Sequence, residues 1–488
     1  MLRDQKNPEA SAKSVSRRRK RQAHKPHPRS GRVDFDDLAV GPAPQLPLPV
    51  YAARRKALAK QLGDGNALVV ATHPPHQYSN DVEYLFRPHS DFWYLTGLDE
   101  PRAVLVLHGG SGATDLFVQP RKKEAEIWTG RRLGVERAPT ALGIDRAHSF
   151  DDLSSALPGV LGKAKVHAIA NHDPAVKRRV ARAAGRRLVA DPPDARPGGP
   201  AKKPAKRKGP PHGSGFLHEM RLVKSADELK MLRKACDLGV AAHEAAARSI
   251  VAGTAEYQVE AAFAHHARHH GSTGVGYPSI CGCGPNAAVL HYVTNRGSLR
   301  KGQLFLADMG CEWGWYTSDI TRTFPVGGEF SSRQAELYDL VHRAQKAALR
   351  KVKPGALFTE VHDTAAQSIS DGLVDAGLLA MDKEKALADK AYRAFFMHGT
   401  SHWLGLDVHD AGARTGPDGK PRRLREGMVL TVEPGLYFNP DFAACPPGTA
   451  GIGIRIEDDV AVTADGVRNL TRGLAAEADA VAALVSRA

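Results

Sequence analysis

The feature that most constrains this chain is a set of acidic residues placed in or beside short apolar runs of its second half. Asp308 lies in the run at 303–309, Glu433 follows the run at 429–432, and Glu457 follows the run at 453–456. Runs of this length and composition are typical of buried strands. Acidic side chains are seldom buried without a partner. The sequence therefore predicts strands that carry a charged site.

A second aspartate, Asp319, lies beyond a turn from Asp308. Gly310 and Gly314 stand between the two, so a pair of strands joined through this bend could bring both carboxylates to one place. An aspartate near a turn is more often a surface or capping residue. The interpretation of the two aspartates as part of a functional site therefore depends on the histidines and glutamates further along the chain.

Three histidines lie within 12 residues, His398, His402 and His409, and glycines are interspersed among them. A single histidine is more often structural than a ligand, but with three in one glycine-rich segment, metal ligation is as good an interpretation as a structural role. Arg455 is two residues before Glu457, so both should project from one face of a strand. An arginine in that place would help to keep nearby carboxylates ionised.

Taken together, these residues predict a metal centre with oxygen and nitrogen ligands. Such a set suits Mn, Fe, Co or Zn and is richer than a single structural zinc requires. Four carboxylates would overcharge one ion, whereas two ions about 3.5–4 Å apart that share bridging carboxylates balance the charge. A pair of ions lowers the pKa of a water and presents hydroxide to a carbonyl, while a glutamate moves the proton and histidines donate to the oxyanion. This chemistry is that of amide hydrolysis.

The 488 residues are enough for two domains. Apolar runs at 67–71, 103–107 and 116–118 predict strands, and 175–184 predicts a helix, which together indicate an N-terminal α/β domain over 46–191. The Pro-, Gly- and Lys-rich segment 192–216 predicts a linker or surface insertion. A second domain, 217–488, should begin with a helix capped by Ser225 and Glu228. The predicted fold class is α/β (α+β).

The net charge of +15 comes from two segments, +9 at 1–33 and +6 at 196–208, so the rest of the chain is neutral. Residues 1–45 lack apolar periodicity and predict a disordered basic tail. Binding of nucleic acid or an acidic partner by this tail is the alternative interpretation. No apolar run is long enough for a membrane span, and the basic N-terminus has no apolar stretch of a secretory signal. Five scattered cysteines do not form a disulfide framework, so a cytoplasmic location is expected.

Six stretches of the second half carry a resemblance to a known family: LHY at 290–292, DMGCE at 308–312, SDITRTFP at 318–325, MHGTSHWLGLDVHD at 397–410, VEPGLY at 432–437 and GIRIED at 453–458. In the first half, SDFWYLTG at 90–97 and EPRAVLV at 100–106 match as well. The chain resembles Xaa-Pro aminopeptidase (aminopeptidase P) over about 46–190 and 217–480. The resemblance implies a C-terminal "pita-bread" metallopeptidase domain behind a smaller α/β domain. It also implies release of the N-terminal residue from peptides with proline at the second position.

The resemblance further implies a role for each matching residue. Asp308 would bind one metal ion, and Asp319 and Glu457 would bridge two. His402 and Glu433 would complete the second ion, and Glu433 would also transfer protons. Manganese is the metal that the family prefers, with zinc, cobalt and iron as alternatives.

Other matching positions would contact the substrate. His291, His398 and His409 would line the site and stabilise the tetrahedral intermediate, with Tyr437 and Arg455 in support. Trp93 would reach the active site of a neighbouring subunit, which implies a homo-oligomer, either a tetramer or a dimer.

Two alternatives stay open, and two others are disfavoured. A prolidase of the same fold, which cleaves Xaa-Pro dipeptides, is the nearest. A methionine aminopeptidase would lack the N-terminal domain, and creatinase-like relatives would lack the metal ligands. A non-catalytic relative that binds nucleic acid or a partner through the basic segments is the alternative from another class.

Overall fold

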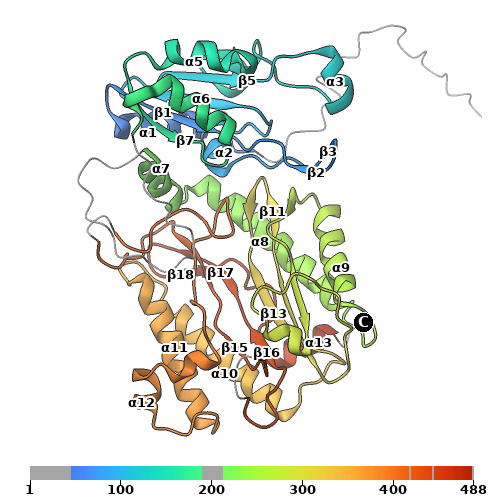
Figure 1. The fold of residues 1–488 in the computed structure, drawn as a ribbon. Coiled ribbons are helices and arrows are strands. Elements are labelled where there is room, and N and C mark those ends of the chain that lie inside the picture. Colours follow the sequence, from blue (N-terminus) through green and yellow to red (C-terminus); the bar gives the residue numbers. More distant parts are fainter. Residues whose placement is uncertain (1–44, 190–212, 417–418, 442–444, 486–488) are drawn as a thin grey trace, which may run out of the picture. The chain divides into compact units, whose positions relative to one another are not determined.

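The computed structural model describes residues 45–189, 213–416, 419–441 and 445–485, all within one structural unit of the chain (Figure 1). The predicted tail lies outside the described residues except for Gln45, and so do residues 192–212 of the predicted linker. Residues 213–216 were also predicted as linker, and this is wrong, because they form the first turn of helix α7 (Gly213–Leu222). Gly213 is buried, and its backbone N–H donates to His167 Nδ1 at 3.1 Å, so the first domain holds the start of this helix.

The first domain is a mixed sheet with helices on both faces. Its strand order is β6-β5-β4-β1-β7, in which β1 pairs antiparallel with β4 and parallel with β7. The elements in chain order are α1 (Leu48–Leu62), β1 (Asn66–Ala71), β2 (Gln77–Ser79), β3 (Val82–Glu83), α2 (Ser90–Thr96), β4 (Val104–His108), β5 (Thr114–Val118), α3 (Lys123–Thr129), α4 (Ala138–Leu142), β6 (Arg146–Ser149), η1 (Phe150–Asp152), α5 (Leu153–Leu161), β7 (Lys165–Ile169), α6 (Pro174–Ala184) and η2 (Gly185–Arg187).

Alternation along the buried strands divides the core of this domain between the two faces of the sheet. Ala67, Val69 and Ala71 of β1 pack with the apolar residues of α5 and α6. Leu68 and Val70 point the other way, into a cluster that includes α1, α2 and residues of the second domain. One continuous core therefore joins the two domains.

The second domain begins with α7 and the long helix α8 (Ala226–Ala247). As predicted, α8 opens with a capping box in which Ser225 and Glu228 satisfy each other's backbone N–H groups. The remaining elements are α9 (Glu256–His269), β8 (Gly274–Val275), β9 (Ile280–Cys283), η3 (Gly284–Ala288), β10 (Leu304–Met309), β11 (Cys311–Trp313), β12 (Tyr316–Thr317), β13 (Ile320–Pro325), α10 (Ser332–Leu349), α11 (Phe358–Asp375), α12 (Lys383–Ala388), η4 (Ala391–Ala394), β14 (Val429–Val432), β15 (Gly435–Tyr437), β16 (Gly453–Arg455), β17 (Asp458–Val462), β18 (Val467–Asn469) and α13 (Ala478–Val485).

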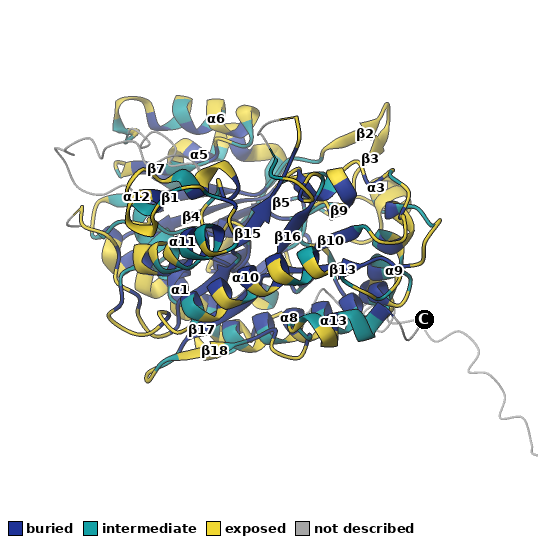
Figure 2. Cartoon of the chain, turned by 90° about the horizontal axis from the view of Figure 1, so that it is seen from below, coloured by how far each residue is buried: buried dark blue, intermediate teal, exposed yellow. Residues whose placement is uncertain are grey.

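Short antiparallel sheets form the interior of the second domain: β13-β10-β9, β12-β11-β8, β14-β17-β18 and β15-β16. Apart from β8 and β18, each at the end of its sheet, these strands are almost wholly buried, while α10 and α13 bury one side and expose the other (Figure 2). The three predicted strand runs at 303–309, 429–432 and 453–456 correspond to β10, β14 and β16. All five cysteines are free, and none of the described helices is long and apolar enough to cross a membrane.

Candidate metal centre

Two neighbouring strands bring the first two carboxylates together. Asp308 lies on β10 opposite Thr321 of β13, and Asp319 lies one residue before β13. The Tyr277 hydroxyl is 2.6 Å from Asp308 Oδ1 and 2.5 Å from Asp319 Oδ1. The hairpin between the strands therefore places both buried carboxylates around one phenol, which has a single proton to donate.

Asp319, His402 and Glu457 form the middle of the cluster, with one ligand atom of each within 4.8 Å of the other two. His402 Nε2 lies 3.2 Å from Asp319 Oδ2. The other ring nitrogen of His402, Nδ1, faces the Trp403 carbonyl oxygen at 3.1 Å. When the neutral ring carries its proton on Nδ1, it donates to that carbonyl oxygen, and the lone pair of Nε2 points toward the carboxylates. A histidine that binds a metal ion through Nε2 needs this arrangement.

Glu433 and Glu457 both lie where strands end. Pro434 follows Glu433 and β14 stops at Val432, so the carboxylate stands at a strand end, as predicted. Glu433 Oε1 is 3.8 Å from His402 Nε2. Glu457 lies between β16 and β17, and Thr321 Oγ1 donates to its Oε2 at 2.7 Å.

Arg455 connects the carboxylates to His398 through a tyrosine. Its Nη2 donates to Asp308 Oδ2 at 2.6 Å, and its Nη1 donates to the Tyr437 hydroxyl at 2.8 Å. Because arginine only donates, the Tyr437 proton is free for His398 Nε2, which is 2.8 Å away. His398 Nδ1 faces the Gly399 carbonyl oxygen at 2.8 Å. Both nitrogens of His398 are therefore engaged by the protein.

The protein groups of this cluster carry an excess of negative charge. Burial raises the pKa of Glu433 to about 7, against the opposing effect of His402. Burial and then Asp319 raise the pKa of Glu457 well above its usual value. Burial opposes the charged form of His402, yet the hydrogen bond and charge of Asp319 raise its pKa to about 9. All three pKa values are raised, as expected for a buried site in which carboxylates outnumber cations.

This donor set fits divalent metal ions. Four carboxylates and one imidazole lie together, and Arg455 is the buried permanent cation that contacts them. Asp319, His402 and Glu457 could hold one ion jointly, with Asp308 and Glu433 on either side of that group. The set matches the ligand preference of manganese, iron, cobalt or zinc.

Two further predicted histidines lie beside the cluster. The ring of His409 is 4.4 Å from that of His402, edge to face, and its side chain is exposed. Burial of part of the ring, and then His402, lower the pKa of His409 to about 4. His291 is exposed in the segment after η3, and its charge also lowers the pKa of both His398 and His409. The structure thus gathers all three predicted histidines at one side of the carboxylates.

Trp93 does not belong to this centre. It lies on α2 and is 1% exposed, with Tyr51 and Trp315 at ring-centroid distances of 6.0 and 6.4 Å. All seven residues of α2 are buried between the two domains. The predicted contact of Trp93 with a substrate or a neighbouring subunit is therefore wrong, because the ring would have to leave the core. The exposed tryptophan of the first domain is Trp128 on α3, at 87%.

An ion-pair network anchors the segment that carries His409. Its members around that segment are two cations and three carboxylates, all buried except Asp407: Arg221, Lys224, Asp91, Asp407 and Asp410. Asp410 directly follows His409; it accepts from Arg221 and, at 2.9 Å, from Lys224. Arg221 also donates to Asp407 at 2.8 Å and to Asp91 of α2 at 2.7 Å. The first domain thus contributes a carboxylate to the anchor of this loop.

Sequence reasoning missed three residues that hold the ligands: Tyr277, Thr321 and Asp459. Asp459 Oδ2 accepts the backbone N–H of Asp319 at 2.9 Å and the thiol of Cys236 at 3.3 Å. Its signal was present in the sequence, since three consecutive acids, 457–459, interrupt an otherwise apolar run. Tyr277 gave no such signal, because a lone tyrosine before a strand is ordinary.

Comparison with known proteins agrees with this geometry. The profile of metallopeptidase family M24 matches residues 230–464, and that of the aminopeptidase P N-terminal domain matches residues 51–169. The chain is 40% identical over 448 residues to the Xaa-Pro aminopeptidase of Escherichia coli K12, an alignment that covers 89% of this chain and 97% of that protein. It is 36% identical over 445 residues to Xaa-Pro aminopeptidase 1 of Streptomyces coelicolor, with 88% and 85% covered.

Solved structures give the same result. Proline aminopeptidase P II from Yersinia pestis matches with a TM-score of 0.82 and 39% identity over 91% of this chain and 100% of that one. Aminopeptidase P from E. coli with the inhibitor Pro-Leu matches with a TM-score of 0.81 and 38% identity, over 91% and 99%.

The fold and both profile matches define an M24 metallopeptidase, a hydrolase, with a pita-bread domain behind an aminopeptidase P N-terminal domain. Within that class, the chain belongs to the Xaa-Pro aminopeptidase family. The predicted fold class and family are confirmed.

Proposed function

We propose that this protein removes the N-terminal residue from peptides whose second residue is proline, in a reaction that requires two divalent metal ions. The observation that carries the proposal is the convergence of the predicted ligand set in a chain that aligns over nearly its whole length with Xaa-Pro aminopeptidases: Asp308, Asp319, His402, Glu433 and Glu457. Divalent ions held there would polarise the peptide carbonyl and lower the pKa of a water molecule.

Glu433 is the proton carrier in this proposal. Its carboxylate stands at the end of β14, with Oε1 3.8 Å from His402 Nε2, so it could exchange a proton with a water molecule at the cluster. It would take the proton of the attacking water and deliver it to the proline nitrogen as the peptide bond breaks.

The histidines would bind the substrate around the reacting carbonyl. His409 and His291 have exposed rings at the edge of the cluster and could donate to the developing oxyanion. His398 has both nitrogens engaged, so its contribution is to line the site, with Tyr437 and Arg455 fixing its ring.

Manganese is the metal that we propose, with zinc, cobalt and iron as alternatives; the donor set accepts all four. We propose a cytoplasmic location, since all five cysteines are free and four of them are buried. A homo-oligomer, tetrameric or dimeric, also remains our proposal, but it no longer rests on Trp93.

The test compares a Xaa-Pro dipeptide with a Xaa-Pro-Yaa tripeptide, using metal-stripped protein with and without added Mn²⁺. We expect metal-dependent cleavage of the first bond of the tripeptide. Cleavage of the dipeptide alone would establish the prolidase alternative. Cleavage of neither, with binding to DNA that weakens steeply with salt, would favour the non-catalytic alternative.

A further inference from the structure

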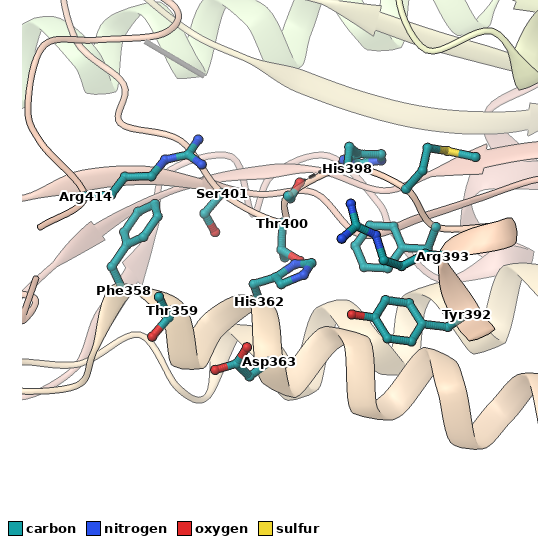
Figure 3. Close-up of a pocket in the computed structure, with 13 residues that line it drawn as sticks. Phe358, Thr359, His362, Asp363, Tyr392, Arg393, His398, Thr400, Ser401 and Arg414 are labelled. Atoms are coloured by element: carbon teal, nitrogen blue, oxygen red, sulfur yellow. Dashed lines mark hydrogen bonds between the residues drawn. The ribbon is translucent and has the colours of Figure 1, made fainter. Parts of the chain in front are cut away.

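A cavity of about 310 Å³ opens beside His398. Figure 3 shows its walls, which come from the start of α11, from η4 and from the loop before His402. Phe358 and His362 project from α11, and Tyr392 closes another side. Because His398 lines both the cavity and the metal centre, a molecule bound across His398 would occupy the two together.

The cavity combines aromatic walls with two arginines and one carboxylate, that of Asp363. Phe396 and Phe358 supply apolar surface, and the guanidinium groups of Arg393 and Arg414 stand at its rim. Both arginines are exposed, and neither has an ion pair within the described part of the chain. Arg414 is held over the Phe358 ring, with its guanidinium carbon 5.7 Å from the ring centroid.

The charges of the two arginines act inside the cavity and at the metal centre. Burial is the largest cause of the lowered pKa of His362; the charge of Asp363 opposes this shift, and those of Arg393 and Arg414 add to it. Arg414 also contributes to the lowered pKa of His409. Because the two arginines outnumber Asp363, a region of net positive charge lies beside the cluster of carboxylates.

We propose that this cavity, hereafter the arginine pocket (Phe358, His362, Arg393, Phe396, His398 and Arg414), binds the residue that follows proline in a short peptide together with its terminal carboxylate. The inference rests on the proposed function and fixes the direction of binding. In the proposed reaction the first peptide bond lies at the metal centre, and the arginines repel the N-terminal ammonium of the peptide. The other end of the peptide must therefore extend toward the arginine pocket, where its carboxylate meets opposite charge and its side chain meets aromatic rings.

The experiment uses the metal-loaded full chain and two substrates, Ala-Pro-Leu and its C-terminal amide. We expect the wild-type KM to be about 5- to 25-fold higher for the amide, since each exposed ion pair is worth up to about a factor of five. In the double variant Arg393→Gln with Arg414→Gln, the ratio of the two KM values should fall toward one. Arg472→Gln removes an exposed arginine elsewhere on the chain and should leave the ratio at its wild-type value.

Equal KM values for acid and amide in the wild type would overturn the inference, as would an unchanged ratio in the double variant. If the wild type cleaves neither peptide, the proposed function fails, and calorimetry decides the inference separately. In that case Pro-Leu should bind the metal-loaded protein more tightly than Pro-Leu amide, and the double variant should abolish this preference. Equal affinities would refute the arginine pocket on its own.

Discussion

Asp410 is the residue whose replacement tests most directly how the fold holds the segment that carries His409. It follows His409 and pairs with Lys224 and Arg221, each at most 3% exposed. In Asp410→Asn the shape is kept, but Lys224 loses its carboxylate while Arg221 keeps Asp91 and Asp407.

The magnitude follows from the burial of the pair. Removing one partner of a buried ion pair costs about 3–5 kcal/mol, because the other charge is left uncompensated. Since Arg221 keeps two carboxylates, we expect the lower end, about 3 kcal/mol of unfolding free energy. Activity on Ala-Pro-Leu should fall about 10- to 100-fold, because a displacement of about 1 Å at His409 is enough for such a loss.

Urea unfolding, metal content and steady-state kinetics together check this prediction. Asp465→Asn removes an exposed carboxylate outside the network and serves as the control. The decisive variant is the double replacement of Lys224→Met with Asp410→Asn, which also removes the cation that Asp410→Asn leaves without its carboxylate. It should be at least about 1 kcal/mol more stable than Asp410→Asn alone. Equal stability of the two variants, or wild-type stability and activity of Asp410→Asn, would refute the reasoning.

Four further predictions concern the loop, the centre and the first domain. In Gly405→Ala the new Cβ would lie 2.2 Å from Asp410 Oδ2, so this variant should reproduce the loss of activity of Asp410→Asn in the same assay. Tyr277→Phe removes the hydroxyl between the two aspartates, and titration of the apoprotein should show about 10- to 100-fold weaker metal binding. Chelation should abolish peptide cleavage and lower the melting temperature, and added Mn²⁺ should restore both, because bound ions compensate the buried carboxylates. Asp115 is fully buried against Arg146 and two histidines, and the net effect of burial and these partners is to lower its pKa. Ionised Asp115 therefore stabilises the fold at pH values above ~3.9, the ordinary aspartate pKa, and this stabilisation is lost as the pH falls below that value. When the unfolding free energy is measured against pH, Asp115→Asn should lack this part of the acid-induced loss.

Much of the fold could be predicted because its signals are local. The apolar runs at 67–71, 103–107 and 429–432 lie within strands, and the capping box of Ser225 and Glu228 begins α8. The pairing of Asp308 with Asp319 was also foreseeable, since a short hairpin leaves few other arrangements. Each of these depends on residues close together in the sequence.

What the sequence did not reveal depends on contacts between distant segments. Trp93 lies in a motif that matches the family, yet its burial follows from packing against Trp315 of the other domain, which no local pattern encodes. The link from Asp91 through Arg221 to Asp410 likewise joins three segments. A lone charged residue in a sequence does not indicate whether its partner lies 130 or 189 positions away.

In our proposal, the arginine pocket also determines which peptides the protein prefers. Its two arginines would favour a molecule whose terminal carboxylate lies one residue beyond the proline. The carboxylate of a longer peptide would lie beyond the pocket. Short peptides would gain from this contact, whereas an internal segment of a chain would not, since internal residues carry no backbone charge. A preference for short peptides would therefore follow from the position of two arginines.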